Sequence, residues 1–253
     1  KSLFPYLSPS GDRYTLYADM LKQPHLLIAG ATGSGKSVVI NALIYTGLFN
    51  HPTDGRGGNL FILIDPKRVE LAQYKALPHT LQYASEPDEM RQAIYNAMQL
   101  CENRYREMQR DGARLYNGGD VYIIIDEFAD LMTTQKRLIM PPIQRLAQIG
   151  RAAKVHIVLA TQTPIAKILP TEIKCNFDAR IALRTRSAQD SRNILGLAGC
   201  EALPRYGYGY YMTPEQTRKT ALPLIPDQEL SARVQWWTDQ KSPLQRMKNR
   251  LVR

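Results

Sequence analysis

The sequence has little of what marks a disulfide-rich, zinc-binding or membrane-spanning protein. Its three cysteines are far apart, odd in number and without a Cys-x-x-Cys pair, and its four histidines are scattered. We therefore expect neither a disulfide framework nor a metal site of cysteine and histidine, and the reducing cytoplasm is the simplest location. No apolar run approaches the roughly twenty residues that cross a bilayer. Internal repeats and low-complexity segments are absent as well.

Also missing are an initial methionine and a signal-like apolar segment, because the chain begins at Lys1. We expect it to be part of a longer protein. If the remainder of that protein is anchored in a membrane, this part would lie at the cytoplasmic face of the cell membrane.

What the chain does contain is enough apolar sequence for one large domain, with 253 residues of which 44% are hydrophobic and 22% charged. We interpret residues 1–24 as a lead-in segment, 25–240 as one α/β domain, and 241–253 as a basic tail or linker. The net charge of +10, from 33 Lys and Arg against 23 Asp and Glu, favours a polyanionic partner, either nucleic acid or an acidic membrane surface.

Gly30-Ala31-Thr32-Gly33-Ser34-Gly35-Lys36-Ser37 fits the P-loop pattern G-x-x-x-x-G-K-[ST] at every fixed position. The apolar run 25–29 before it predicts a buried strand. After it, apolar residues at Val38, Ala42, Tyr45 and Phe49 predict a helix over 37–49. The alternative, a Gly/Ser-rich loop that matches by accident, is disfavoured because both flanks agree with the motif.

This turn predicts a nucleotide-phosphate site that binds ATP with Mg²⁺. Backbone N–H groups of the glycine-rich turn would surround the β-phosphate at the positive end of the following helix. Lys36 would reach the β- and γ-phosphates, and Ser37 would ligate Mg²⁺. The predicted nucleotide-binding residues are Gly30, Thr32, Gly33, Ser34, Gly35, Lys36, Ser37 and Val38.

Strand and helix patterns alternate along the rest of the chain. Further apolar runs predict buried strands over 60–64, 121–125, 156–160 and 179–183 after a loop over 50–59, and helices are predicted over 87–110 and 139–153, the second interrupted by Pro141-Pro142 near its start. This alternation predicts an α/β fold with a mainly parallel central sheet flanked by helices. In such sheets ligands bind at the carboxyl ends of the strands.

Asp126-Glu127 follows the strand over 121–125 and provides the second half of the predicted site. Asp126 would complete the Mg²⁺ shell, and Glu127 would polarise the attacking water, which favours hydrolysis over transfer to a hydroxyl. Gln162, at the end of the neighbouring strand, is placed to sense the γ-phosphate; the alternative is a polar residue that caps the strand. We expect Lys36, Glu127 and Gln162 to be catalytic.

Several strings occur in the order of a known family: the P-loop, Ile64-Asp65-Pro66-Lys67 with Glu70-Leu71, Asp126-Glu127-Phe128-Ala129-Asp130-Leu131-Met132, Arg151-Ala152-Ala153, the strand into Gln162, and Asp190-Ser191-Arg192. This resembles the motor domain of FtsK/SpoIIIE-family DNA translocases, from about Gly11 to Trp237. The resemblance implies a RecA-like ATPase that assembles into a hexameric ring and pumps double-stranded DNA through its pore. It also implies that Arg151 is an arginine finger acting on the neighbouring subunit's ATP; the alternative is a surface arginine at a helix end.

The chain departs from the family pattern at Thr163-Pro164, where many members have Arg-Pro, and at Ala188, where a basic residue is common. It also lacks the winged-helix module that reads DNA orientation in chromosome translocases. As DNA-binding candidates we take basic residues on connections at one side of the sheet, with solvated surface charge as the alternative. These candidates are Lys167, Lys174, Arg184 and Arg186.

Two aromatic stretches have structural interpretations. The stretch 206–211 predicts a turn entering a strand with packed tyrosines, not a base-stacking platform. Trp236-Trp237 is expected on a closing helix, as core or docking surface.

Four functions remain open at this point. The leading one is an ATP-hydrolysing DNA motor. A coupling ATPase for conjugation, with a relaxase or channel partner, and a secretion ATPase that moves protein are the alternatives within the same class. A regulatory nucleotide-binding module is a fourth, which Glu127 disfavours because a switch needs no catalytic carboxylate.

Overall fold

In the computed structural model, the described residues are 4–7, 16–18, 20, 22–48, 58–222 and 224–239. Two short strands, β1 (Phe4–Leu7) and β2 (Leu16–Ala18), pair antiparallel with each other, apart from the main sheet. Of the predicted lead-in segment, these strands, Met20 and residues 22–24 are described, whereas Phe49, most of the loop over 50–59 and the tail over 241–253 lie outside the described residues.

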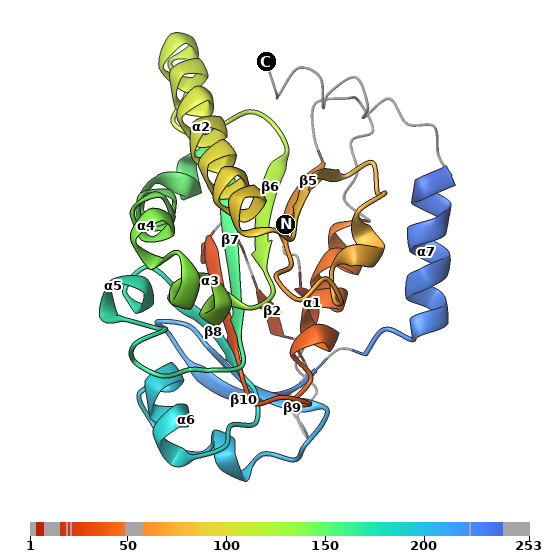
Figure 1. Cartoon of the computed structure of the whole chain (residues 1–253), viewed down its shortest axis with the longest axis vertical. Coiled ribbons are helices and arrows are strands. Elements are labelled where there is room, and N and C mark those ends of the chain that lie inside the picture. Colours follow the sequence, from red (N-terminus) through yellow and green to blue (C-terminus); the bar gives the residue numbers. More distant parts are fainter. Residues whose placement is uncertain are drawn as a thin grey trace.

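A sheet of eight strands forms the centre of the molecule, in the order β10-β9-β8-β3-β7-β6-β4-β5 (Figure 1). Six strands are parallel, and β9 and β10 join one edge antiparallel. The predicted mainly parallel sheet is therefore confirmed. The strands are β3 (His25–Ala29), β4 (Asn59–Ile64), β5 (Thr80–Ala84), β6 (Asp120–Ile125), β7 (Val155–Thr161), β8 (Ala179–Ala182), β9 (Tyr208–Met212) and β10 (Thr217–Ala221).

Helices cover both faces of this sheet, with α2 to α6 on the left of Figure 1 and α1 and α7 on the right. Alternate residues of each inner strand point to opposite faces, so Leu27 packs into the cluster under α2 and α4, whereas Leu26 and Ile28 pack into the cluster under α1 and α7. The helices are α1 (Lys36–Gly47), α2 (Pro87–Asp111), α3 (Phe128–Thr134), α4 (Lys136–Ala153), α5 (Thr171–Lys174), α6 (Ala188–Leu195) and α7 (Asp227–Asp239), with short 3₁₀ turns η1 (Ala72–Tyr74) and η2 (Cys200–Ala202).

Local signals explain the long helix α2. It begins with Pro87 at its first position, and the side chain of Glu89 accepts from the backbone N–H of Glu86 at 3.2 Å in a capping box. It ends at Gly112, whose φ of 64° is the left-handed conformation that glycine adopts readily. The predicted helix over 87–110 is confirmed to within one residue.

The predicted interruption of α4 by Pro141-Pro142 is wrong. The helix starts three residues earlier than expected, at Lys136, and continues through both prolines. The prolines remove two backbone donors early in the helix. The apolar face of Ile139, Ile143 and Leu146 is buried against the sheet, and this packing holds the helix together.

The expected strand in the tyrosine-rich stretch is confirmed as β9, with Tyr211 buried. Trp237 of α7 is buried as core, while Trp236 is 48% exposed. Among the described residues, no helix is both long enough and apolar enough to cross a bilayer.

Candidate functional site

The P-loop is the turn between β3 and α1, and its glycines are required by space and by conformation. Gly33 and Gly35 have φ of 72° and 102°, which side chains with a Cβ rarely adopt. A Cβ on Gly30 would lie 2.6 Å from the Cβ of Leu183 and 2.7 Å from the hydroxyl of Ser34. The turn is also held by its neighbours, since Gly30 N–H donates to Thr161 O at 3.2 Å and Ala31 N–H to Arg184 O at 2.8 Å.

Lys36 and Asp126 form a buried ion pair, although 90 residues separate them. The Lys36 ammonium donates to the backbone oxygen of Asp126 at 2.6 Å and to its carboxylate, and the two side chains are 5% and 1% exposed. Burial raises the pKa of Asp126 above its usual range, while the nearby charge of Lys36 acts in the opposite direction. The strand order explains the meeting, because only β7 lies between β3 and β6.

Glu127 is buried, and protein donors hold both oxygens of its carboxylate. Oε1 accepts from the Thr161 hydroxyl at 2.8 Å and from the backbone N–H of Gln162 at 3.1 Å. Oε2 accepts from the same N–H at 3.3 Å and from the ammonium of Lys67 at 3.3 Å. Lys67 lies within one of the family strings, but its role was not predictable from the sequence, because its contact with Glu127 depends on the neighbouring positions of β4 and β6.

Gln162 connects the P-loop with Glu127. Its side-chain oxygen accepts from the Thr32 hydroxyl at 2.8 Å, while its backbone N–H donates to Glu127. The expected position at the end of the strand next to the P-loop is therefore the observed one. Because Gln162 contacts both Thr32 and Glu127, a displacement of one of these residues is transmitted to the other.

The residues predicted to hold ATP and Mg²⁺ fit these ligands. The Asp126 Oδ2 and Ser34 Oγ atoms are buried, and neither has a hydrogen-bond partner among the described residues. The orphaned oxygen belongs to a carboxylate that contacts Lys36, the residue before Ser37 in the chain, and such an oxygen suits a hard divalent cation. Thr32 and Gly33 are exposed, while Ser37 and Val38 are half-buried at the start of α1, so the turn is open to a ligand.

Two residues that flank the β9–β10 hairpin, Arg205 before it and Leu222 after it, lie against the P-loop, which the sequence did not predict. The Arg205 guanidinium lies 3.6 Å from where a Cβ on Gly33 would be, and Leu222 lies 3.3 Å from the equivalent point on Gly35. Leu222 N–H donates to Gly207 O at 2.9 Å, which closes the base of the hairpin. No local pattern indicates this contact, since about 170 residues separate its partners (205 − 33 = 172).

Arg151 lies away from this chain's own nucleotide site. It is exposed in the last turn of α4, four residues before β7 begins, and thus at the amino edge of the sheet. The seven residues of β7 separate that edge from the P-loop edge by about 20 Å. The helix end is firmly held, because buried Arg104 donates to Ala153 O at 2.7 Å and Lys154 O at 3.1 Å.

The expectation that the four DNA-binding candidates share one side of the sheet is wrong. Arg184 and Arg186 are exposed just after β8, beside the P-loop, whereas Lys174 lies five residues before β8, at the amino edge. The backbone oxygen of Lys174 accepts from Arg180 at 2.8 Å. Lys167 lies on the connection between β7 and α5. Because β7 and β8 are both parallel to β3, this connection must return to the opposite edge.

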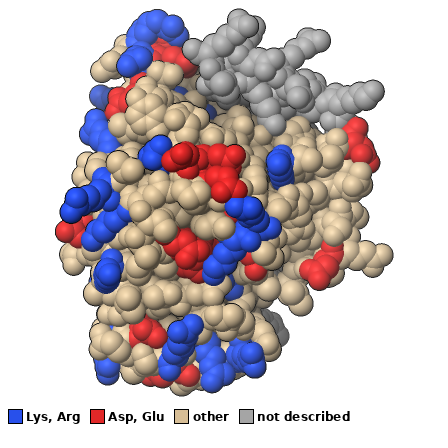
Figure 2. Space-filling view, in the orientation of Figure 1, with Lys and Arg blue, Asp and Glu red and all other residues tan. Residues whose placement is uncertain are grey.

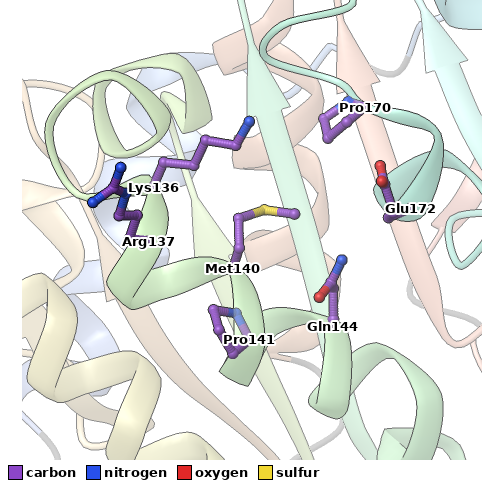
Figure 3. A pocket seen from close by; sticks show the side chains of 7 residues that line it. All are labelled: Lys136, Arg137, Met140, Pro141, Gln144, Pro170 and Glu172. Atoms are coloured by element: carbon purple, nitrogen blue, oxygen red, sulfur yellow. The ribbon is translucent and has the colours of Figure 1, made fainter.

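Surface charge is mixed on the face seen in Figure 2, where basic side chains alternate with acidic ones over the helices. A separate hollow of about 490 Å³ lies between α4 and the start of α5 (Figure 3). These helices cover the face of the sheet opposite α1 (Figure 1). The lining of the hollow carries charges of both signs, and it comprises Lys136, Arg137, Met140, Pro141, Gln144, Pro170 and Glu172. The hollow is not part of the nucleotide site.

Comparison with known proteins connects this site to a family. The model of the FtsK/SpoIIIE family matches residues 5–123 and 119–166. A DNA translocase FtsK of Rickettsia prowazekii (strain Madrid E) is 38% identical over an alignment of 241 positions, and the match covers 78% of this chain and 32% of the relative. The chain thus spans about a third of the length of that relative.

Two solved structures share the fold. The pCW3 conjugation coupling protein TcpA, in its monomer form with ATPγS, has a TM-score of 0.78 at 21% identity. This match covers 91% of the present chain and 69% of the TcpA chain. The cytoplasmic domain of the Type VII secretion ATPase EccC of Thermomonospora curvata has a TM-score of 0.77 at 22% identity. This match covers 94% of the present chain and 31% of the EccC chain. The predicted P-loop NTPase fold is confirmed.

Proposed function

This chain belongs to the FtsK/SpoIIIE family, and we propose that it is an ATP-driven motor domain that moves double-stranded DNA through a ring of six identical subunits. The observation that carries the proposal is the convergence of the P-loop, the Lys36–Asp126 pair and the held carboxylate of Glu127 at one edge of the sheet. The 38% identical relative named DNA translocase FtsK supports DNA as the substrate.

The nucleotide would bind along the P-loop, with the backbone of Gly30, Gly33 and Gly35 and the start of α1 facing its phosphates. Lys36 would leave Asp126 for the β- and γ-phosphates. Mg²⁺, held by the Ser37 hydroxyl and Asp126 Oδ2, would supply positive charge to the transferring phosphoryl group. In this way Asp126 exchanges one positive partner for another and is never left unpaired in its buried position.

Glu127 would accept a proton from the attacking water. Gln162 would sense whether the γ-phosphate is present and transmit this state between Thr32 and Glu127 through its two contacts. A carboxylate in this place serves hydrolysis, so Glu127→Gln should bind ATP and keep it bound without hydrolysing it. A regulatory module without turnover has no use for such a carboxylate.

Arg151 would act on the ATP of the neighbouring subunit. Its place at the amino edge, about 20 Å from its own P-loop along β7, supports action in trans. A guanidinium at the transferring phosphoryl group is worth roughly 10³–10⁵ in rate. Mixing Arg151→Ala subunits with Lys36→Ala subunits should therefore restore part of the ATPase activity that each variant lacks, and no recovery at any ratio contradicts the assignment.

DNA contacts would be made by exposed basic residues on loops. Arg184 and Arg186 remain candidates at the carboxyl edge, and Lys167 remains one on the connection between β7 and α5. Lys174 would reach DNA only from the other edge. Contacts of this kind go to phosphates and predict binding that weakens steeply with salt. We place the domain in the cytoplasm, where ATP is available, with any membrane anchor in the remainder of the protein.

The test is steady-state ATPase activity at fixed low salt, with and without long double-stranded DNA, alongside Lys36→Ala. Strong stimulation that is lost in the variant and weakened by salt supports the DNA motor. Basal hydrolysis that is indifferent to any nucleic acid contradicts it and favours protein secretion. Stimulation that depends on a relaxase or channel component favours conjugative coupling.

A further inference from the structure

Lys67 contacts the carboxylate assigned to hydrolysis, although it belongs to neither nucleotide motif. Its ammonium lies 3.3 Å from Oε2 of Glu127, and the Glu127 side chain is 3% exposed. We propose that Lys67 is a positioning residue, which holds the Glu127 carboxylate in the orientation from which it activates water. The inference rests on the role of Glu127 in the proposed function.

The two oxygens of Glu127 are held unequally. Oε1 accepts two contacts of 2.8 and 3.1 Å from β7 and Gln162, whereas both contacts to Oε2 measure 3.3 Å. A carboxylate oxygen accepts about two hydrogen bonds, and the weakly held Oε2 is the oxygen best able to exchange a contact for water. The terminal torsion of glutamate is broad, so a donor at Oε2 is needed to fix the plane of the group.

Hydrogen bonds fix the backbone of the turn that carries Lys67. Asp65 O accepts from the backbone N–H of Arg68 at 3.1 Å, and Asp65 Oδ2 accepts from the N–H of Leu71 at 3.0 Å. Arg68 has a φ of 58°, which is unusual for a residue with a Cβ, and its side chain pairs with Glu86. Such a conformation persists where its surroundings impose it. Lys67 therefore projects from a fixed backbone.

The two lysines of the site have different environments. Lys36 is 5% exposed and engaged with Asp126, whereas Lys67 is 43% exposed and approaches Glu127 from solvent. Each acid of the Asp126-Glu127 pair thus has its own lysine, one from the P-loop and one from the end of β4.

The experiment compares Lys67→Met, which removes the charge at similar length, with Lys67→Arg, which keeps a donor for the carboxylate. Lys75→Met is the matched control, because Lys75 is exposed on the same β4–β5 connection and lies over the Tyr83 ring at 5.6 Å. For each variant of the full chain, kcat and KM for ATP and the dissociation constant of ATPγS are measured.

We expect Lys67→Met to lower kcat by about tenfold to a hundredfold, the size of effect that a small misplacement of a reacting group produces. KM and ATPγS affinity should stay within about twofold of wild type, Lys67→Arg should recover most of the rate, and Lys75→Met should match wild type.

Unchanged or faster turnover in Lys67→Met overturns the proposal. So does an equal loss in Lys75→Met, or a weakened ATPγS affinity that accounts for the loss. Glu127→Gln, measured in parallel, separates this inference from the proposed function. If Glu127→Gln is inactive while Lys67→Met is fully active, only the proposed role of Lys67 is wrong. Full activity of Glu127→Gln contradicts both the role of Lys67 and the role of Glu127 in hydrolysis.

Discussion

Replacing Lys36 with methionine should destabilise the nucleotide-free protein, because it strands a buried charge. Lys36 and Asp126 are 5% and 1% exposed, and Asp126 Oδ2 has no hydrogen-bond partner among the described residues. Methionine keeps most of the packing volume and removes the cation. Breaking one side of a buried ion pair costs about 3–5 kcal/mol, so we expect a loss of that size in the free energy of unfolding.

Urea denaturation without nucleotide or Mg²⁺ measures this loss. With a slope of about 3 kcal/mol per molar urea, the midpoint should fall by about 1 M or more. Adding Asp126→Asn to Lys36→Met should then recover most of the stability, because the amide is neutral and similar in shape. A double-mutant cycle over the four proteins gives the coupling energy between the two side chains.

Two results would refute this reasoning. One is a loss below about 1 kcal/mol in Lys36→Met, the value of a solvent-exposed pair. The other is a double variant no more stable than Lys36→Met, which would mean that the loss came from packing and not from the stranded carboxylate.

Three further predictions concern the framework around the site. Burial lowers the pKa of His25 from 6.5 to about 3, and Ile157 N–H donates to its Nδ1 at 3.1 Å. Between these two pH values the unfolded chain binds a proton on His25 and the folded chain does not. The free energy of unfolding should therefore be full above pH 6.5 and fall by about 1.4 kcal/mol per pH unit as pH drops toward 3. Urea midpoints from pH 7 to 4 should lose much of this slope in His25→Gln, and an identical slope contradicts the assignment. Gly30→Ala should weaken ATPγS binding more than tenfold by calorimetry, since its Cβ would lie 2.6 Å from Leu183 Cβ. Gly112→Ala strains a left-handed backbone with φ of 64° at the end of α2, outside the P-loop, so it should lower stability and leave ATPγS binding normal. Arg104→Met should lower the free energy of unfolding by about 2 kcal/mol, because it orphans the carbonyl of Ala153 at the end of α4, while Lys154 O keeps the N–H of Val121. The exposed neighbour Arg106→Met should change the free energy of unfolding by less than about 0.5 kcal/mol.

The P-loop and the strand that ends in Asp126-Glu127 could be predicted from the sequence because their signals are local. A glycine-rich turn between an apolar run and a helical pattern specifies its own conformation. Parallel strands place their carboxyl ends at one edge, so the sequence also determined that Asp126, Glu127 and Gln162 lie near Lys36. Helix α2 was predicted for the same reason, since the length and the apolar periodicity of its sequence are local signals.

Tertiary structure decided which of these groups touch. The strand order places β7 between β3 and β6, and this order lets Gln162 contact both Thr32 and Glu127. It also brings Lys67, which follows β4, to Glu127, and Arg205, which precedes β9, to Gly33 of the P-loop. Local periodicity indicates that a strand is buried, but it does not indicate which strand lies beside it. That choice is made by long-range packing of the two helix layers, as are the continuous path of α4 through Pro141-Pro142 and the separation of Lys174 from Arg184.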